Sequence, residues 1–469
     1  MYPIIRLEHI ELKNFKSIKY GVIDHLEYRN KLFYTGSSDI LGIYGQNGSG
    51  KTAVIEAVKV LKDLMSGKPL SEEVSHMIYH GETQTILKFA FYIEDHGQTD
   101  HENVRYDVHY DVCISNEVKE HLKTKNPIYI KSESISYSKI GVRPRVELIR
   151  YECENNQTVF LPKVRVNEVT RQNPNAMIQL EVARRTSLQN SISFIFHSDV
   201  IDLFASPKVN KEYGRILSLL HYYAKMNLFV ISNRNIEESG LCYIPISFRI
   251  TLDDIVSSGI APISLIGPST VDAQSYELIR LVIGQLNLVV SSVLPQMQLS
   301  LHELERSMGV DGKAQRIIEI MSVKNHREIP LKYESEGIKK ILSILSTLIS
   351  VYNNPSVCLV VDELDAGIFE YLLGELLSIL KRYGKGQLVF TSHNLRPLEK
   401  LPKESIIVST TNEYNRFIRI PKEKGNSNYR NSYLRGIDLG GLNEEIYQTT
   451  NSFQISHAFR KAGEFLEEE

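Results

Sequence analysis

The sequence predicts a mixed α/β fold that also contains an antiparallel β subdomain and a helical insertion. Three observations lead to this prediction. Near the N-terminus, a buried strand runs through a glycine-rich turn into an amphipathic helix, "ILGIYGQNGSGKTAVIEAVKVL". Toward the C-terminus, short apolar strands again alternate with helical patterns. Between these two regions, a series of alternating strand patterns is followed by long helical ones.

The composition is that of an ordinary globular protein. The 469 residues are 42% hydrophobic and 23% charged, with a net charge of −2, which predicts no general attraction to nucleic acid. The four cysteines are far apart and form no C-x-x-C pair, so neither a zinc site nor a disulfide framework is expected. No stretch of roughly 18 residues is apolar and uncharged, and the N-terminus lacks the layout of a signal peptide. We therefore expect a cytoplasmic protein without a membrane segment.

The first half of the chain is expected to be rich in strands. Residues 4–15 alternate as a strand, and 40–44 form a short buried one. Residues 52–65 carry apolar side chains at helical spacing. Four alternating runs then predict an antiparallel meander from 84 to about 166.

The second half is expected to begin with helices, from about 180 to 294. After it, the patterns predict strands at 316–323 and 328–333, a helix at 337–352, a strand at 357–361, a helix at 367–382, and strands in "GQLVFTSHN" and "SIIVSTT". No internal repeat and no sustained heptad pattern is found in the sequence.

The glycine-rich turn matches the pattern G-x-x-x-x-G-K-[ST]. Glycines let the backbone curl so that successive N–H groups face one anion, and the following helix adds its positive N-terminal end. Lys51 can then reach the β- and γ-phosphates, and the Thr52 hydroxyl can bind Mg²⁺. An ordinary turn between a strand and a helix is the alternative, but the pattern and its flanks favour a nucleotide. The residues expected to bind its phosphates are Asn47, Gly48, Ser49, Gly50, Lys51 and Thr52.

Two other strand ends carry polar residues that suit the same site. "SVCLVVDELDAGIF" ends its apolar run in Asp362, which can hold Mg²⁺ through waters, and Glu363, which can accept a proton from the attacking water. "LVFTSHN" places His393 after another strand, where it can bond the γ-phosphate. The alternatives are a solvated acidic turn and an ordinary turn histidine. Parallel strands place ligands at their carboxyl ends, which favours the functional interpretation.

A fourth element begins a helix in "LKYESEGIKKILSILSTLI". Ser335 and Gly337 lie at the N-terminus of that helix, where backbone N–H groups attract anions. An ordinary N-cap is the alternative. Ser335 precedes Asp362 by 27 residues (362 − 335).

Taken in order, "KNFKSI", "GQNGSGKT", "SEGIKK", "LVVDELDAG" and "FTSHN" resemble the ABC-type ATPases of the SMC, RecF and OLD kind. The chain is similar in particular to the bacterial AAA-15-type ATP-binding proteins of anti-phage defence loci. This resemblance implies an ABC-type P-loop ATPase core, a mixed sheet with flanking helices, with ATP and Mg²⁺ as cofactors. It implies that Thr52 and Asp362 serve the metal, that Glu363 is the catalytic base, and that His393 is the switch histidine.

The resemblance also implies an assembly. Asp365 would lie in the D-loop at a dimer interface, and Ser335 and Gly337 would form the signature motif that closes over ATP held by the other subunit. A homodimer or higher homo-oligomer joined by an ATP sandwich is therefore expected. The signature reads SEG rather than SGG, and the Q-loop glutamine is left open between Gln84 and Gln189.

On this basis we divide the chain into four parts. They are an N-terminal lobe with the Walker A motif and the meander (1–180), a mainly helical insertion (181–295), a C-terminal lobe with the signature, Walker B motif and switch histidine (296–415), and a C-terminal extension (416–469).

The long interval between the motifs excludes several classes of ATPase. About 280 residues separate the phosphate loop from the signature, which argues against a transporter ATPase, and the absence of heptads argues against a long coiled coil. Only 76 residues follow His393, without an acidic cluster, so no nuclease domain is expected. The leading hypothesis is a nucleotide-gated sensor or regulator of a separately encoded effector in anti-phage defence. The alternatives are a RecF-like DNA-repair ATPase and an ATP-dependent assembly scaffold.

Nucleic acid is kept as a possible partner. The stretch 416–435 holds six Lys and Arg against one acidic residue, with Tyr429 and Tyr433 among the charges. Aromatic rings between cations can stack on bases, although a solvated loop is the more common explanation.

Overall fold

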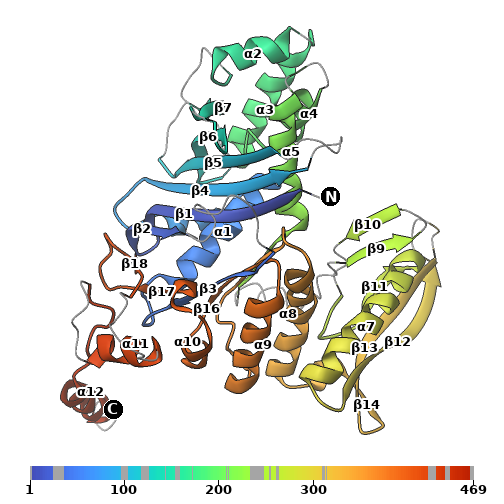
Figure 1. Ribbon diagram of the computed structural model, residues 1–469, viewed down its shortest axis with the longest axis vertical. Helices are drawn as coiled ribbons and strands as arrows, with labels where there is room; N and C mark the ends of the chain where they lie inside the picture. Colours follow the sequence, from blue (N-terminus) through green and yellow to red (C-terminus); the bar gives the residue numbers. More distant parts are fainter. Residues whose placement is uncertain are drawn as a thin grey trace.

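A core sheet between two apolar layers organises the fold (Figure 1). The computed structural model describes residues 3–24, 36–96, 104–117, 126–142, 144–153, 159–171, 173–206, 209, 211–232, 248–252, 255–259, 263–308, 312, 314–420, 429–438 and 444–464. Three parts of the chain discussed above lie outside these residues. They are Cys242, residues 421–428 of the basic stretch 416–435, and the two ends of the chain.

The core sheet has the strand order β18-β17-β3-β16-β15-β8. Its strands are β3 (Asp39–Tyr44), β8 (Leu228–Ile231), β15 (Cys358–Val361), β16 (Gln387–Thr391), β17 (Ile406–Ser409) and β18 (Phe417–Ile418). All but β18 run parallel, so their carboxyl ends lie along one edge of the sheet. The mixed α/β fold predicted from the sequence is confirmed.

The edge strand β8 was not predicted. It lies within the range expected to be helical and follows helix α5 (Lys211–Met226) after a single residue. Its four residues are too few for a period to be measured, and they extend the apolar pattern of the helix before them. Parallel pairing with β15 gives this segment its strand conformation.

Side chains of the core sheet point alternately into two apolar layers. Leu41 and Val360 pack on one face with α1 and α5. Tyr44 and Leu359 pack on the other face with α8, α9 and α10. The bounds of these helices are α1 (Lys51–Met65), α8 (Glu336–Asn353), α9 (Glu370–Tyr383) and α10 (Arg396–Lys400), and the 3₁₀ turns near the core are η1 (Glu72–Met77) and η3 (Lys403–Ser405).

The second large sheet is antiparallel throughout, in the order β2-β1-β4-β5-β6-β7. Its strands are β1 (Ile4–Phe15), β2 (Ile18–Asp24), β4 (Gln84–Asp95), β5 (Val104–Ser115), β6 (Tyr129–Lys139) and β7 (Val146–Glu152). β4 to β7 form the predicted meander, which ends earlier than expected. The helices α2 (Lys163–Thr170), α3 (Ala176–Asn190) and α4 (Ser198–Ala205) follow it.

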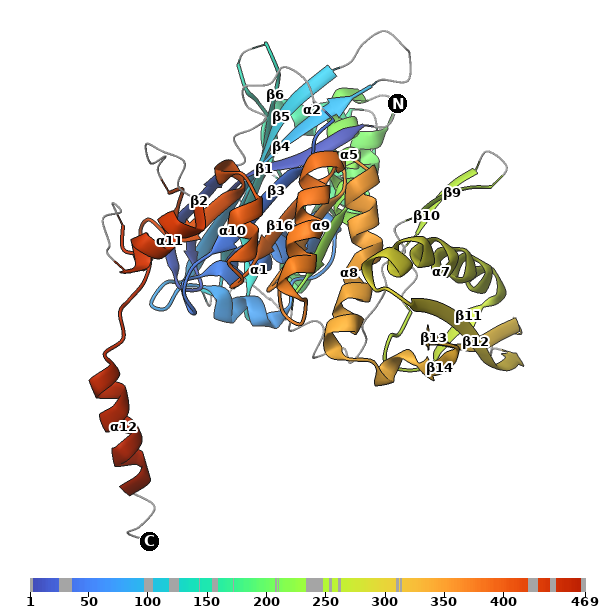
Figure 2. The ribbon, with the colours of Figure 1, turned by 60° about the horizontal axis from the view of Figure 1, so that its bottom comes forward.

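A smaller unit stands beside α8 (Figure 2). It contains α7 (Ala273–Val293) and the strands β11 (Ser269–Asp272), β12 (Met297–Met308), β13 (Ala314–Lys324) and β14 (Arg327–Pro330), with the hairpin β9 (Phe248–Leu252) and β10 (Ile255–Gly259) nearby and η2 (Leu331–Tyr333) leading to α8. In the described part of the chain, α7 alone is long and apolar enough to cross a membrane. Its Ile279, Val282 and Leu286 are buried with Leu299 and Ile320 of the sheet, and 28% of its most apolar 18-residue window is buried.

The last two helices in the described residues are α11 (Tyr429–Asp438) and α12 (Ser452–Glu464). α11 lies against the core, whereas α12 extends away from the body of the molecule (Figures 1 and 2). All the side chains described in α12 are exposed.

Candidate nucleotide site

Three neighbouring parallel strands bring the predicted motifs to one edge of the core sheet. β3 leads into the glycine-rich turn, β15 ends at Val361 directly before Asp362, and β16 ends at Thr391. β16 pairs with both of the others. Residues more than 300 positions apart therefore meet: the Oγ1 atom of Thr52 lies 3.4 Å from Oδ1 of Asp362.

The glycine-rich turn has the geometry of an anion cradle. Gly45, Gly48 and Gly50 have φ angles of +148°, +80° and +87°, which side chains rarely adopt. A Cβ atom at Gly45 would lie 2.0 Å from the Oγ of Ser409, so the turn packs directly on β17. α1 begins after Gly50 without any side-chain cap, and its first N–H groups are thus available to an anion.

Lys51 points back over this turn. Its Nζ donates to the carbonyl oxygens of Gly45 and Gln46, each at 2.8 Å. Burial lowers the pKa of Lys51, while the carboxylates of Asp362 and Glu363 act in the opposite direction. A phosphate group at the turn would add further negative charge and favour the ammonium form.

Asp362 is buried and faces two hydroxyl groups. Its Oδ1 accepts a hydrogen bond from Thr391 Oγ1 at 2.6 Å and lies close to Thr52 Oγ1. No group of three or more His, Cys, Asp or Glu residues among the described residues can hold a metal alone. One hydroxyl and one carboxylate fit Mg²⁺, which usually takes one or two carboxylates and completes its shell with phosphate oxygens and water.

Glu363 and His393 also face the cavity. Glu363 has a left-handed backbone, with φ +48°, and its N–H donates to Thr391 Oγ1 at 2.7 Å. Asp365 holds the turn that carries His393: its Oδ2 accepts the N–H groups of His393 and Asn394 at 3.2 and 3.1 Å. Its Oδ1 is buried and has no hydrogen-bond partner in the described part of the chain.

The glycine-rich turn and the residues after β15 and β16 border a cavity of about 1050 Å³, whose described lining does not include Asp365. The predicted site residues that line it are Asn47, Gly48, Gly50, Lys51, Thr52, Asp362, Glu363 and His393. Ser49 is buried beneath the turn, with its Oγ 2.5 Å from that of Ser409. The volume is large enough for a whole nucleotide, for which binding pockets of roughly 300–1,000 Å³ are usual.

Ser335 and Gly337 are not among the described lining of this cavity. Ser335 is the N-cap of α8, and its Oγ accepts the N–H of Ile338 at 3.4 Å. Gly337 packs against the loop after Asp365, where a Cβ would lie 2.1 Å from the carbonyl oxygen of Gly367. Neither Gln84 nor Gln189 belongs to the described lining either, so the Q-loop assignment stays open.

Part of the cavity wall was missed by the sequence analysis. It comes from turns at the antiparallel sheet and after β17, namely Lys16, Ser17, Ser75, His76, Ile78, Tyr79, His80, Gly81, Glu82, Asn116, Glu413 and Arg416. Lys16 forms an ion pair with Glu56 of α1, and the Tyr79 hydroxyl donates to Glu413 at 2.6 Å. Such turn residues have no periodicity. Lys16, within "KNFKSI", has a positive φ, and the residue type lysine does not predict this backbone conformation.

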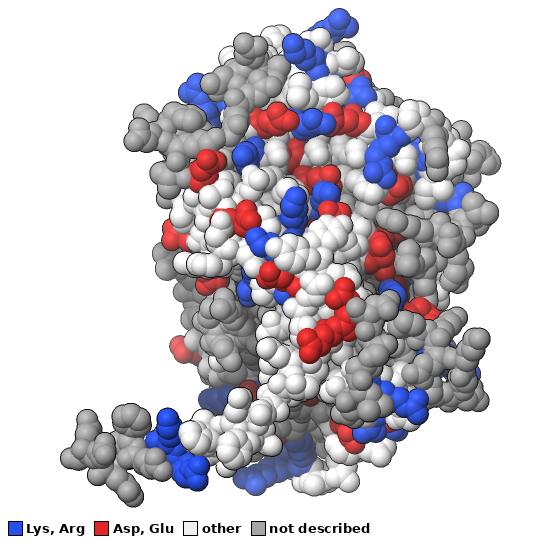
Figure 3. All heavy atoms as spheres, turned by 90° about the vertical axis from the view of Figure 1, so that its left-hand side faces the viewer, with Lys and Arg blue, Asp and Glu red and all other residues white. Residues whose placement is uncertain are grey.

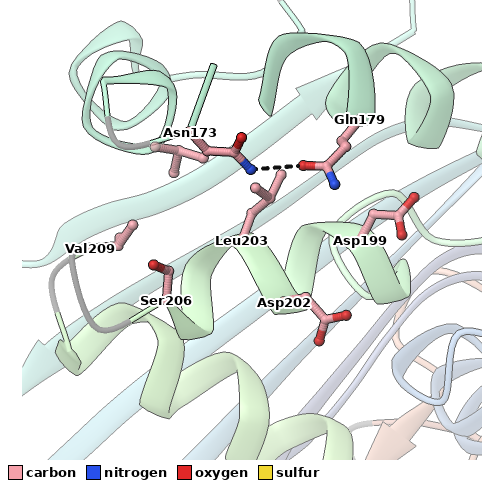
Figure 4. A pocket seen from close by; sticks show the side chains of 8 residues that line it. Asn173, Gln179, Asp199, Asp202, Leu203, Ser206 and Val209 are labelled. Carbon is pink, nitrogen blue, oxygen red and sulfur yellow. Dashed lines mark hydrogen bonds between the residues drawn. The ribbon is translucent and has the colours of Figure 1, made fainter. Parts of the chain in front are cut away.

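A second, smaller cavity of about 200 Å³ lies between α3 and α4 (Figure 4). Asn173 donates to Gln179 across it at 3.1 Å, and Asp199 and Asp202 project from α4 at its edge. Lys and Arg are missing from its described lining, so it has no evident means of holding a phosphate.

The proposed base-stacking tyrosines are placed differently from what the sequence suggested. Tyr429 and Tyr433 are 5% and 7% exposed. The Tyr433 ring packs edge-on against the Tyr44 ring, with 6.2 Å between the ring centroids. They therefore belong to the core and cannot stack on bases. On the face shown in Figure 3, the coloured Lys and Arg are interspersed with Asp and Glu instead of forming one basic band.

Comparison with known protein families gives a match in the first half of the chain. A family model described as an AAA domain matches residues 9–222. No curated protein matches the sequence.

Solved structures show distant likenesses. One is the SmcHead bound to the C-winged helix domain of ScpA, with 13% sequence identity and a TM-score of 0.41, covering 88% of this chain and 96% of that chain. Another is the SMC head domain from Thermotoga maritima, with 13% identity and a TM-score of 0.36, covering 89% of this chain and 100% of that chain. The recombination mediator protein RecF with ATP is another (11%, 0.33, 83% and 94%). The residues that line the cavity, and not these likenesses, support the function proposed below.

Proposed function

We propose that this protein is an ABC-type ATPase of the SMC and RecF kind that binds ATP with Mg²⁺ and hydrolyses it. One observation carries the proposal: the phosphate-loop residues Lys51 and Thr52 face Asp362 and Glu363 in a single cavity, although more than 300 residues separate them. An ordinary glycine turn would not need acidic strand ends beside it.

Each side chain has a definite task in this proposal. The N–H groups of the turn and the Lys51 ammonium hold the phosphates, and Thr52 and Asp362 hold the metal ion. Bound Mg²⁺ neutralises charge on the phosphate oxygens. Glu363 takes the proton of the attacking water, and His393 bonds the γ-phosphate from the end of β16. Asp365 fixes the main chain that carries His393.

Assembly as a homodimer or higher homo-oligomer is part of the proposal. Ser335 and Gly337 begin α8 outside the described lining of their own cavity, which supports their use by the nucleotide of another chain. Two chains related head to tail would then enclose two nucleotides. ATP would control the closing of this assembly, and hydrolysis its opening.

A more specific proposal concerns the biological role of ATP binding and hydrolysis. We propose a nucleotide-gated sensor or regulator of a separate effector, and we place it in anti-phage defence on the strength of the motif resemblance. A second metal-dependent active site finds no support in the described residues, where no group of three or more His, Cys, Asp or Glu side chains is placed to hold a metal ion. A RecF-like repair ATPase and an assembly scaffold remain the alternatives.

Two experiments test the proposal. ATP binding and phosphate release by the purified chain are measured for the wild type, Lys51→Ala and Glu363→Gln. We expect ATP binding and hydrolysis by the wild type, strongly weakened binding by Lys51→Ala, and binding without hydrolysis by Glu363→Gln. A wild-type chain that binds no ATP would refute the proposal.

The second experiment captures partners from the native host with the Glu363→Gln chain and ATP, with Lys51→Ala as the matched control. One stoichiometric protein retained only by Glu363→Gln supports the regulator. Nuclease-sensitive DNA without a protein supports the repair ATPase, and additional copies of the chain alone support the scaffold.

A further inference from the structure

Lys340 is a cation next to the site that the proposed chemistry does not use. It lies in the second turn of α8, and its Nζ donates to the main-chain carbonyl oxygen of Glu363 at 2.6 Å. Burial lowers the pKa of Lys340, and the carboxylates of Glu363, Asp365 and Asp362 oppose this effect. The ammonium group is therefore close to the acidic end of β15 but bonds the backbone there.

The peptide groups on both sides of Glu363 are held. The backbone N–H of Glu363 donates to Thr391 Oγ1, and the Thr391 hydroxyl donates to the Asp362 carboxylate. The carbonyl after it accepts from Lys340. Glu363 has a φ of +48°, and a left-handed residue other than glycine persists only where its surroundings enforce that conformation.

The start of α8 touches the same loop at a second point. Gly337 packs on Gly367 so closely that no side chain fits between them. Lys339, the neighbour of Lys340, is directed elsewhere: its Nζ contacts Glu336 and the carbonyl oxygen of Lys332. Only one of the two adjacent lysines thus bonds the main chain of the catalytic turn.

We propose that Lys340 is a positioning residue that fixes the peptide after Glu363, aims the Glu363 carboxylate, and links the start of α8 to it. The inference rests on the proposed function. Because Ser335 and Gly337 begin the same helix, a shift of α8 when a second chain's nucleotide binds there would reach Glu363 of the same chain through this bond. Lys340 itself touches no reacting atom.

The test separates binding from turnover. The ATP dissociation constant, kcat and thermal unfolding are measured for the wild type, Lys340→Met, Lys340→Arg and the matched control Lys339→Met. We expect Lys340→Met to lower kcat by about 10-fold or more, since small misplacements of catalytic groups cost up to about 100-fold. Its ATP affinity should stay within about two-fold of wild type, because the phosphate-loop lysine is intact. Lys340→Arg keeps a donor of similar reach and should recover most of kcat.

Several outcomes would overturn the inference. Wild-type kcat in Lys340→Met would do so, and so would equal losses of kcat and stability in Lys340→Met and Lys339→Met, which would indicate helix packing alone. If Lys340→Met does not fold, Lys340→Gln takes its place under the same criteria. A wild-type chain that binds no ATP would remove the proposed function, whereas a hydrolysing wild type with an unaffected Lys340→Met would remove only this inference.

Discussion

The two helices that begin beside the proposed chemistry, α1 and α8, start in opposite ways. α1 follows a left-handed glycine, Gly50, and has no side-chain cap. α8 follows Ser335, whose hydroxyl already accepts the N–H of Ile338. The first N–H groups of a helix lack partners within the helix. α1 therefore offers these donors to an anion directly, whereas at α8 one of them, the N–H of Ile338, is already bonded to the Ser335 hydroxyl.

This difference suggests an order of events. The N-terminus of α1 can hold a phosphate in the single chain, without a partner subunit. The N-terminus of α8 suits a second step, in which an external anion competes with the Ser335 hydroxyl for the N–H of Ile338. A helix that exchanges partners in this way can transmit the exchange to its neighbours, and α8 contacts the backbone of Glu363 through Lys340 and Gly367 through Gly337.

The largest expected effect is at the α1 end. Lys51→Ala should weaken ATP binding about 10- to 150-fold, because a hydrogen bond to a charged group contributes roughly 1.5–3 kcal/mol. A titration with a fluorescent ATP analogue measures it. Lys59→Ala, on the same helix but outside the described cavity lining, is the control and should bind like wild type. Equal affinities for Lys51→Ala and wild type would mean that α1 holds no phosphate.

At the α8 end, the expected effect is on stability first. Gly337→Ala places a Cβ 2.1 Å from the carbonyl oxygen of Gly367, so α8 or the loop must move. Overpacking of this kind costs about 1–3 kcal/mol, and we expect that loss in urea unfolding.

The control for Gly337→Ala is a glycine in open space. Gly284 lies within α7, and no atom is within 4 Å of a Cβ built there. Gly284→Ala should raise the free energy of unfolding by about 0.5–1 kcal/mol, since glycine disfavours a helix interior. A Gly337→Ala chain as stable as wild type would refute the close packing of α8 on the loop.

A smaller effect distinguishes conformation from packing in the phosphate turn. A Cβ at Gly48 meets no atom within 4 Å, but its φ is +80°. Gly48→Ala should therefore cost about 1–2 kcal/mol through backbone strain alone. Calorimetry with and without ATP measures this loss, and we expect weaker ATP binding in parallel. Unchanged stability would show that the turn tolerates side chains, unlike a tight anion cradle.

The smallest effect should come from the α8 cap. Ser335→Ala removes the hydroxyl that accepts the Ile338 N–H, and loss of such a cap costs about 1 kcal/mol. ATP binding to the single chain should not change, because Ser335 is outside the described cavity lining. Hydrolysis should fall most at high protein concentration, where two chains meet. The measurement is turnover per chain against concentration, and a uniform loss would contradict a role between chains.

The core motifs were predictable because each combines residue type with a strand or helix boundary. "GQNGSGKT" is such a case, and the acidic end of β15 is another. Parallel strands then imply that these ends meet, as Thr52 and Asp362 do. The meander was equally readable, since strict alternation over long strands has few competing explanations.

What escaped prediction depends on tertiary contacts. β8 is a strand because β15 pairs with it, and its four residues carry no signal of their own. Tyr429 and Tyr433 look like surface aromatics among charges, yet both pack into the core. Lys340 is one of two adjacent lysines in the sequence, and only the orientation of α8 decides which of them reaches Glu363.

The strand order of the core sheet has a consequence for how the protein is made. β3 pairs with β16, so Leu41 faces Val389, 348 positions later in the chain (389 − 41). During synthesis, β1 and β4 to β7 can pair with near neighbours early, while β3 must wait for its partners. Bringing such distant segments together is slow, and unpaired apolar strands attract wrong partners meanwhile. The phosphate turn can therefore take its final form only after β16 and β17 have been synthesised.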